Sequence, residues 1–430
     1  MFHEGCWPEC WKLHTICPLY KKKSAFDPGN YRGVHLTPIL SKIAEHVIGK
    51  YLIDYLRKNS FGPNQWAFTP GRSARDLVTC LIMKWILAFS KGLKVGAYLG
   101  DITGAFDRVC KEYLMAKLQA AGVGEKFLKF MDSYLEARIG RVVVEGEMSD
   151  DIVIDNSVFQ GTVLGPTLWN SFFADVATPA RSGGGEETVF ADDLSVFQEF
   201  DKEMPSESIR QQLAESQDEV AKWGIRNRVE FDKDKEHIAV IHPIHGEGDL
   251  FKLLGCCVDA KLTMCPAIDK TMSQITPKIT ALLRTRAYYD VPNLIVQFKT
   301  HIWGIMEAHS GGIFHACSSQ LDRFDHCQQR FVETLGLSEE AAFRDNNFAP
   351  PVLRRNIGIL GMLHKRVLGL CHQDFEQLLP WFSQVFGYTV EGRHTKQLYN
   401  HVLEVQFHIG LFRRSIFAMT DMIKYLLRSE

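Results

Sequence analysis

Apolar residues recur at helical spacing in several stretches of the first half of the chain. This spacing predicts helices over residues 36–58, 75–92, 107–122, 165–180 and 206–226. Thr37 and Pro38 stand at the start of the first stretch, so we expect Thr37 to cap the helix and Pro38 to take its first position. Asp107 is likewise interpreted as a helix cap.

Short runs of apolar and β-branched residues lie between these helices and predict strands. A buried strand is expected over 94–101, hairpins over 140–161, 187–197 and 251–259, and two short strands over 228–242. From about residue 265 to the end the pattern is helical. Short strands among helices, followed by a mainly helical region, predict an α+β fold with a largely antiparallel sheet.

Composition is typical of a globular protein, with 46% hydrophobic and 23% charged residues, and 430 residues suggest two to four subdomains. We expect no membrane span and no signal peptide, because no apolar run reaches 18 residues and the first residues lack an apolar segment. Eleven scattered cysteines fit reduced intracellular thiols. A net charge of −2 means that a nucleic-acid binder would need a local positive face.

Three carboxylates give the first indication of chemistry. Asp101 follows the predicted strand over 94–101, and Asp192 and Asp193 stand between the apolar runs of ETVFADDLSVF. If the hairpin lies beside the strand end, the three groups cluster and repel one another unless a cation is present. Oxygen ligands of this kind favour Mg²⁺ or Mn²⁺, and two such ions suit phosphoryl transfer. Taken singly, each feature is more simply interpreted as a solvated turn or a helix cap.

Seven sequence blocks, taken in order, favour the metal site over a solvated turn or a helix cap. They are PLYKKKSAFDPGNYRGVHLTPILSKIAEHVI (18–48), QWAFTPGRSARDLV (65–78), DITGAFDRV (101–109), SVFQGTVLGPTLWN (157–170), FADD (190–193), WGIRNRVEFDKDK (223–235) and FKLLGCCVD (251–259). In this order they resemble the reverse transcriptase domain of non-LTR (LINE-type) retrotransposons, over roughly residues 7–360. Residues 281–336 are similar to the helical region that follows the palm in that family.

The resemblance implies a right-hand polymerase with an antiparallel palm sheet and a helical C-terminal region. It places the fingers at 1–93, the palm at 94–260 with a hairpin region at 123–156, a thumb-like region at 261–345 and a helical extension at 346–430. The implied activity is RNA-directed DNA synthesis, in which deoxynucleoside triphosphates extend a primer 3′-hydroxyl. The implied partners are an RNA template and a DNA primer, with no membrane and no obligate protein partner.

The same resemblance implies a retrotransposon origin, and we expect the chain to lack an endonuclease segment because the fingers block begins almost at once. An intracellular location is expected, with the nucleus favoured if the element is active. Arg354-Arg355 and Arg413-Arg414 in the helical extension are further candidates for phosphate contacts.

The resemblance implies roles for individual residues in each block. Asp101, Asp192 and Asp193 match the family's metal-binding carboxylates, which hold two Mg²⁺ (or Mn²⁺) ions, with Asp193 in a supporting role. Lys235 matches the lysine that protonates the leaving pyrophosphate, and we count it with the three aspartates as catalytic. Phe106 matches the aromatic residue that excludes a ribose 2′-hydroxyl.

Further positions match the family's substrate contacts. Arg32 matches the fingers arginine that grips the incoming triphosphate, with Lys22 and Lys23 nearby. Gln160 and Gly161 match the loop beside the nucleotide, template and primer, since a glycine allows close approach of the backbone. Leu254 and Gly255 match the turn that meets the template and primer.

Some positions depart from the family pattern. Gly33 and Phe159 stand where proline is common, Gly104 where lysine is common, and Thr162 where serine is common. Because Gly33 and Phe159 affect loop rigidity, the alternative is a catalytically weakened, RNA-binding remnant. A nucleotide cyclase is a third interpretation, and the blocks around Arg32 and Gln160 argue against it.

Overall fold

The computed structural model describes residues 4–21, 24–387, 397–401 and 404–422. The chain divides by its contacts into two units. The first comprises Met1–Thr69, Tyr98–Phe197 and Gln211–Glu236, and the second comprises Pro70–Ala97, Gln198–Arg210 and His237–Glu430. The division into fingers, palm, thumb and extension stays a prediction.

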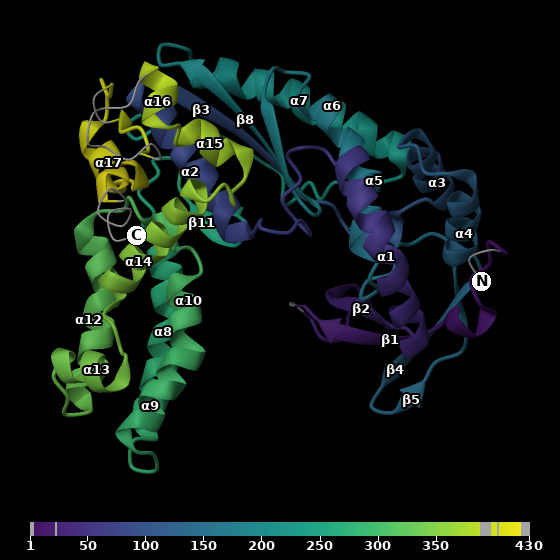
Figure 1. Cartoon of the computed structure of the whole chain (residues 1–430), viewed down its shortest axis with the longest axis horizontal. Helices are drawn as coiled ribbons and strands as arrows, with labels where there is room; N and C mark the ends of the chain where they lie inside the picture. Colours follow the sequence, from purple (N-terminus) through teal and green to yellow (C-terminus); the bar gives the residue numbers. More distant parts are fainter. Residues whose placement is uncertain (1–3, 22–23, 388–396, 402–403, 423–430) are drawn as a thin grey trace. The chain divides into compact units, whose positions relative to one another are not determined.

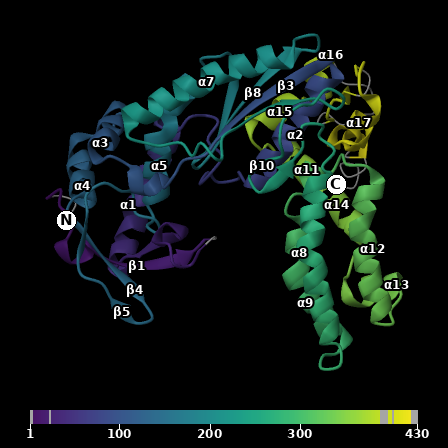
Figure 2. The same cartoon turned by 180° about the vertical axis from the view of Figure 1, so that it is seen from behind.

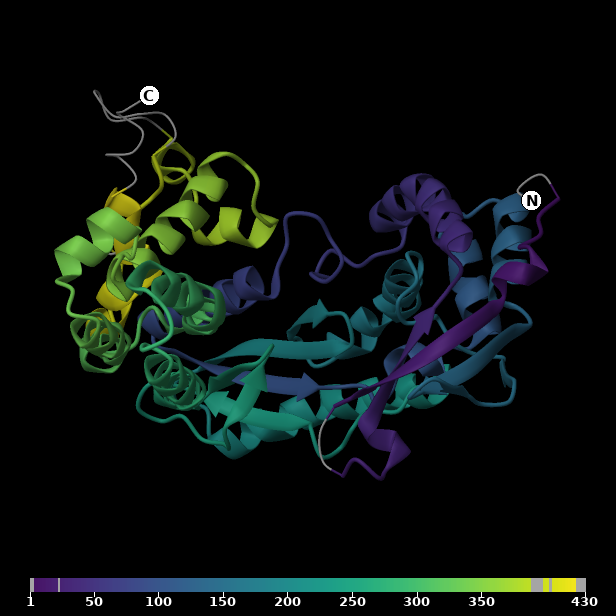
Figure 3. The ribbon, with the colours of Figure 1, turned by 90° about the horizontal axis from the view of Figure 1, so that it is seen from below.

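One mixed sheet belongs to the first unit. Its strands are β1 (Leu13–Tyr20), β2 (Tyr31–Leu36), β4 (Arg138–Val144), β5 (Glu147–Met148) and β6 (Ile152–Ile154). The order is β2-β1-β4-β5, β6 also pairs with β4, and β1 runs parallel to β4. Figure 3 shows β1 and β2 as the purple strands. The apolar pattern failed to predict β1 and β2, because their burial does not alternate from residue to residue.

Helices of the first unit are α1 (Ile39–Asn59), α3 (Lys111–Ala120), α4 (Glu125–Leu135), α5 (Gly165–Phe173), α6 (Ala177–Ala180) and most of α7 (Ser206–Asn227). In Figure 1, α1 lies beside α5. Two predicted caps are wrong. Pro38 is the N-cap of α1, without a side-chain bond, and Cys110 is the N-cap of α3. Asp107 lies instead in the short 3-10 helix Ala105–Arg108.

A second sheet has the order β7-β8-β3-β9. Its strands are β7 (Glu186–Phe190), β8 (Asp193–Asp201), β3 (Leu93–Gly100) and β9 (His237–Ile241). The predicted hairpin over 187–197 is confirmed, since β7 and β8 pair antiparallel and Phe190 faces Asp193. Ala191 and Asp192 are therefore a two-residue turn. Only β9 forms in 228–242; the expected earlier strand is reduced to a bridge between Ile102 and Phe231.

The second unit is mainly helical, as the sequence predicts. It contains α2 (Ala74–Ser90), the hairpin β10 (Phe251–Leu253) with β11 (Cys256–Val258), α8 (Cys265–Arg284), α9 (Val291–Phe298), a π-helical turn (Lys299–Trp303), α10 (Gly304–Glu307), α11 (Ser310–Ile313), α12 (Ser318–Thr334), α13 (Glu339–Asn346), α14 (Pro351–Val367), α15 (Gln373–Leu378), α16 (Phe382–Phe386), α17 (Ile409–Arg414) and a 3-10 helix (Ile416–Met422). Figure 2 shows α8 beside α12. Within the described residues, every helix is too short or too polar to cross a bilayer.

Side chains from two other segments fix the turn between β7 and β8. Ala191 has φ 58°, a left-handed conformation that is costly for a residue with a Cβ. The Gln65 side-chain oxygen accepts hydrogen bonds from Ala191 N (3.1 Å) and Ala67 N (3.0 Å). Trp169 Nε1 of α5 donates to Ala191 O (2.9 Å). Both backbone polar groups of Ala191 are thus satisfied by side chains, which stabilises the strained turn.

Gln65→Ala is expected to destabilise the protein by about 1–3 kcal/mol, because two backbone donors lose their acceptor. It should also lower any activity that depends on the turn. Urea unfolding monitored by fluorescence measures the first effect. Asn64→Ala is the matched control, because Asn64 bonds to Glu187 of β7 and not to the turn. An equal loss of activity in the two variants would contradict this role of Gln65.

Candidate active site

Asp101 is held at the end of β3 by the segment 229–236. Thr103 N donates to Glu230 O (3.0 Å), and Asp232 N donates to Asp101 O (2.8 Å). This pairing brings the side chain of Lys235 onto the Asp101 carboxylate, and Lys235 Nζ also lies 2.9 Å from Asp232 Oδ2. Burial alone would lower the pKa of Lys235, but its hydrogen bonds to Asp101 and Asp232 raise it, so Lys235 remains a cation at neutral pH.

The three predicted carboxylates act on one another electrostatically. Burial raises the pKa of Asp193 to about 7, with Asp192 and then Asp101 adding to the shift. Burial also raises the pKa of Asp192, again with Asp101 adding to it, while Arg32 and Lys235 oppose the shift. Each of these effects requires the charges to act on one another over a short range. The structure therefore brings Asp101, Asp192 and Asp193 together with Lys235, and brings Arg32 within electrostatic reach.

The donor set fits a hard divalent cation. Carboxylate oxygens are the ligands that Mg²⁺ and Mn²⁺ prefer, and clustered carboxylates remain ionised more easily when a cation is near. Over the residues described, no three His, Cys, Asp or Glu side chains are already arranged around one point as metal ligands. The ammonium of Lys235 instead supplies the positive charge beside Asp101.

Phe106 is half-buried, and its ring stacks on Trp169 of α5 with a centroid distance of 5.9 Å and an interplanar angle of 20°. Its carbonyl accepts from Val158 N (2.9 Å). Gly104, where lysine is common in the family, adopts φ 63° just before this short helix, and a glycine takes this conformation without strain. Phe106 is therefore fixed between the Asp101 segment and α5.

The loop with Gln160 and Gly161 packs on β2. Gln160 O accepts from His35 N (2.7 Å). Gly161 has φ 101°, and a Cβ at this position would lie 2.9 Å from His35 O. A side chain at position 161 would therefore clash with the backbone of β2. Thr162 Oγ1 bonds to Phe159 O (2.7 Å), a bond that serine would also make.

Glu45 of α1 holds the other side of this loop, and the sequence reasoning missed it. Its side chain is fully buried, and Oε2 accepts from Val163 N (2.7 Å) and Leu164 N (3.2 Å). These amides precede α5, where the helix dipole favours a negative charge. A signal was present, because Glu45 lies on the apolar face of a helix with Ile48 and Leu52, where carboxylates are rare.

Phe159 packs in a buried cluster and is not part of a loose loop. Its ring lies 4.8 Å from that of His14 and 5.5 Å from that of His35. The guanidinium of Arg138 lies 4.8 Å from the Phe159 ring and donates to Tyr134 O (2.6 Å). Burial, followed by the charge of Arg138, lowers the pKa of His14 to about 3 and that of His35 to about 4, so both imidazoles are neutral.

The remaining predicted residues belong to other segments of the chain. Arg32 is exposed on β2, opposite Leu19, and Gly33 of the same strand pairs with Pro18. Lys22 and Lys23 lie outside the described residues. Leu254 and Gly255 belong to the second unit, where they form the turn between β10 and β11 with φ 49° and 87°. Positive φ at both positions is typical of a tight type I′ hairpin turn.

Comparisons with known proteins identify the family of the chain. Residues 20–275 match the family model described as "Reverse transcriptase (RNA-dependent DNA polymerase)". A probable RNA-directed DNA polymerase from transposon X-element of Drosophila melanogaster is 24% identical over 360 residues, which is 76% of this chain and 38% of that protein. An RNA-directed DNA polymerase from mobile element jockey of the same species is 30% identical over 239 residues, covering 53% of this chain and 25% of its own length.

Among solved structures, apo telomerase from Candida tropicalis, truncated from its C-terminal domain, is similar with a TM-score of 0.43 and 12% identity, covering 58% of this chain and 54% of that one. The chain spans 38% or less of the length of the two curated relatives named above. The residues matched by the family model, 20–275, make up more than half of the chain. The chain belongs to the reverse transcriptase (RNA-dependent DNA polymerase) family.

Proposed function

We propose that this chain is an RNA-directed DNA polymerase that transfers nucleotides from deoxynucleoside triphosphates to a primer 3′-hydroxyl on an RNA template. The proposal rests on the pairing of Lys235 with Asp101 and on the raised pKa values of Asp192 and Asp193, to which the charge of Asp101 contributes. Reverse transcriptases use divalent metal ions and deoxynucleoside triphosphates. A retrotransposon origin is in keeping with the mobile elements named among the relatives.

Asp101 and Asp192 would hold two Mg²⁺ or Mn²⁺ ions, with Asp193 adding negative charge. Such ions, when bound, activate a hydroxyl and neutralise the charge that develops on the transferred phosphoryl group. Every other contribution belongs to the chain itself. Gln65 and Trp169 orient the turn that carries Asp192, and the pairing with segment 229–236 orients Asp101.

Charged and aromatic side chains would position the nucleotide. Arg32 lies within electrostatic reach of Asp192, which suits a contact with a triphosphate bound beside the carboxylates. Lys235 keeps its proton at neutral pH and is the candidate donor to the leaving pyrophosphate. Phe106, supported by Trp169, offers bulk where a ribose 2′-hydroxyl would otherwise fit. Nuclear localisation would follow if the element that encodes the chain is active.

Asp192→Ala is expected to lower deoxythymidine incorporation on poly(rA)/oligo(dT) by more than about 100-fold, beyond the 10- to 100-fold typical of residues that only support a metal ligand. The measurement is primer extension with purified protein in Mg²⁺ and in Mn²⁺. Asp218→Ala removes an exposed carboxylate from α7 and serves as the control. Incorporation by the Asp192 variant at the control rate would refute the site assignment.

Asp193→Asn is expected to raise the melting temperature at pH 8 without divalent cations. The pKa of Asp193 is about 7 in the folded protein and 3.8 in a model compound. The folded state therefore loses stability as the pH rises through this window, and the neutral asparagine avoids that loss. A gain of a few degrees corresponds to about 1 kcal/mol for a domain of this size.

Two conditions check this sign in a thermal unfolding experiment. At pH 4 the difference between Asp193→Asn and the wild type should shrink, because the carboxyl is then mostly protonated in the folded protein. Mg²⁺ at pH 8 should favour the wild type, since only the carboxylate attracts the ion. A wild type that melts above the variant at pH 8 in EDTA would show that Asp193 is not under repulsion.

Glu45→Gln is expected to raise the KM for deoxynucleotides roughly tenfold, because the loop with Gln160 and Gly161 loses a charged acceptor worth about 1.5–3 kcal/mol. The melting temperature should fall by several degrees as well, since the weakened hydrogen bonds also stabilise the fold. Steady-state kinetics on one template separates KM from kcat. Glu147→Gln, on the exposed strand β5, is the control. An unchanged KM together with a lower melting temperature would assign Glu45 a purely structural role.

A further inference from the structure

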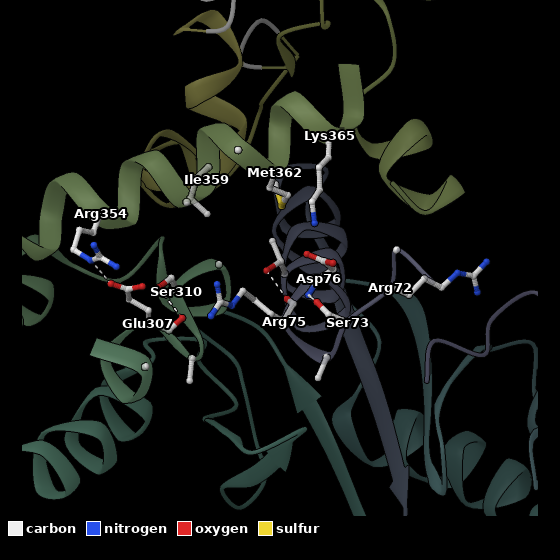
Figure 4. A pocket seen from close by; sticks show the side chains of 18 residues that line it. Arg72, Ser73, Arg75, Asp76, Glu307, Ser310, Arg354, Ile359, Met362 and Lys365 are labelled. Carbon is white, nitrogen blue, oxygen red and sulfur yellow. Dashed lines mark hydrogen bonds and ion pairs between the residues drawn. The ribbon is translucent and has the colours of Figure 1, made fainter. Parts of the chain in front are cut away.

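A cavity is lined entirely by residues of the second unit, and none of Asp101, Asp192 and Asp193 lines it. It has a volume of about 890 Å³ and is lined by the start of α2, by α10 and α11, and by one face of α14 (Figure 4). All of these elements belong to the second unit. α14 lies beyond residue 275, where the match to the reverse transcriptase family ends.

Basic side chains dominate the charge of this cavity. Arg72 and Arg75 come from the start of α2, and Arg354 and Lys365 come from α14. Two acidic residues, Asp76 and Glu307, also line it. In Figure 4, Lys365 extends from α14 toward the start of α2, and Arg75 extends toward Ser310. These two charges therefore reach into the cavity from opposite walls.

The basic residues of α14 have different roles. The helix carries four arginine or lysine side chains and one histidine, and it has no acidic side chain. Arg355 and Arg366 are buried, and they bond to Asp325 (2.9 Å) and Leu379 O (3.0 Å), so the phosphate contact expected for Arg355 is not available.

Arg354 is already engaged, because it pairs with Glu307 and stacks on the ring of Trp303 at 3.6 Å. Lys365 is exposed and lines the cavity, so it is the cation of α14 best placed for a ligand. Arg75 is likewise exposed at the opposite wall.

The start of α2 adds to the positive potential. α2 has 17 residues, and Ser73 caps it by accepting from Asp76 N (3.1 Å). The first turn of a helix carries a partial positive charge and presents backbone N–H groups that suit anions. This helix start alone would not define a site, but here it points into a cavity with basic side chains from two elements.

Glycines on α14 are the second, independent feature. Gly358 and Gly361 line the cavity on the same face as Arg354 and Lys365. A glycine inside a helix costs about 1 kcal/mol relative to alanine. A Cβ at either position would meet no atom within 4 Å, and the same is true of Gly304 on the opposite wall. Packing does not require these glycines, whereas close approach of a ligand to the helix backbone would.

We propose that this cavity binds the phosphodiester backbone of single-stranded nucleic acid, with Arg75 and Lys365 contacting phosphates and Gly358 and Gly361 leaving room for the strand. A strand fits better than a single phosphate group, because the two cations come from opposite walls and do not converge on one point. This binding site is additional to the proposed catalytic site. It assigns the helical region after residue 346 a role in binding nucleic acid.

A salt titration tests the proposal. The probe is a 20-nucleotide labelled RNA, and a DNA strand and a duplex of the same sequence are the parallel arms. For the double variant Arg75→Ala/Lys365→Ala, the slope of log affinity against log salt should fall by about 1.4, at about 0.7 per phosphate lost from a single strand. The control Lys222→Ala/Arg226→Ala removes the same charge from exposed positions on α7 and should keep the wild-type slope.

An unchanged slope for the cavity variant overturns the proposal, and so does a change seen only with the duplex. Equal slopes with RNA and DNA indicate that the shared backbone is recognised, and a larger effect with RNA indicates that the 2′-hydroxyl contributes. Incorporation of nucleotides is measured separately, so that inactivity of the polymerase site is not confused with loss of this site.

Two double substitutions of the glycines test stability and binding separately. Gly358→Ala/Gly361→Ala should raise the melting temperature, because alanine favours a helix and the space is open. Gly358→Leu/Gly361→Leu should lower the affinity for the RNA strand about tenfold or more while the protein remains folded. Wild-type affinity in the leucine variant would show that the cavity holds no strand.

Discussion

Repulsion among three partly buried carboxylates is the constraint on which the first unit depends. Asp101, Asp192 and Asp193 come from two separate segments, and burial with mutual charge holds the pKa of Asp193 at about 7. Such an arrangement does not form by itself, because each group would be more stable in water. The surrounding contacts must therefore fix the backbone of both segments, and a cation must compensate the charge. Lys235 provides part of that compensation.

The backbone is fixed by side chains that take no part in the chemistry. Gln65 and Trp169 satisfy the polar groups of Ala191, and Glu45 satisfies two amides at the start of α5. Since Trp169 also stacks on Phe106, α5 connects the carboxylate turn to the residue proposed to select the sugar. The position of α5 therefore determines the position of both the turn and Phe106. This explains why the loop that precedes α5 is fixed by hydrogen bonds to buried groups.

Sequence reasoning reached the hairpin of Asp192 and Asp193 and the buried strand before Asp101, because both depend on local apolar pattern and turn residues. It missed β1 and β2, whose residues are half-buried in no regular alternation, and it misplaced the caps at Thr37 and Asp107. The support from Gln65 was also missed, since a side chain that bonds to a turn 126 residues later leaves no periodic signal. Glu45 did leave one, as a carboxylate on an apolar helix face.

The net charge of the chain is a poor guide to what its surfaces bind, and the reason is physical. The total of −2 sums acidic and basic groups that the fold separates. Three carboxylates gather at one sheet end in the first unit, and basic side chains of α2 and α14 gather around one cavity in the second. Clustered acidic groups attract cations, and clustered basic groups attract polyanions. Since charges act mainly within about 10 Å at moderate salt, the local sets determine what each surface binds, and their sum does not.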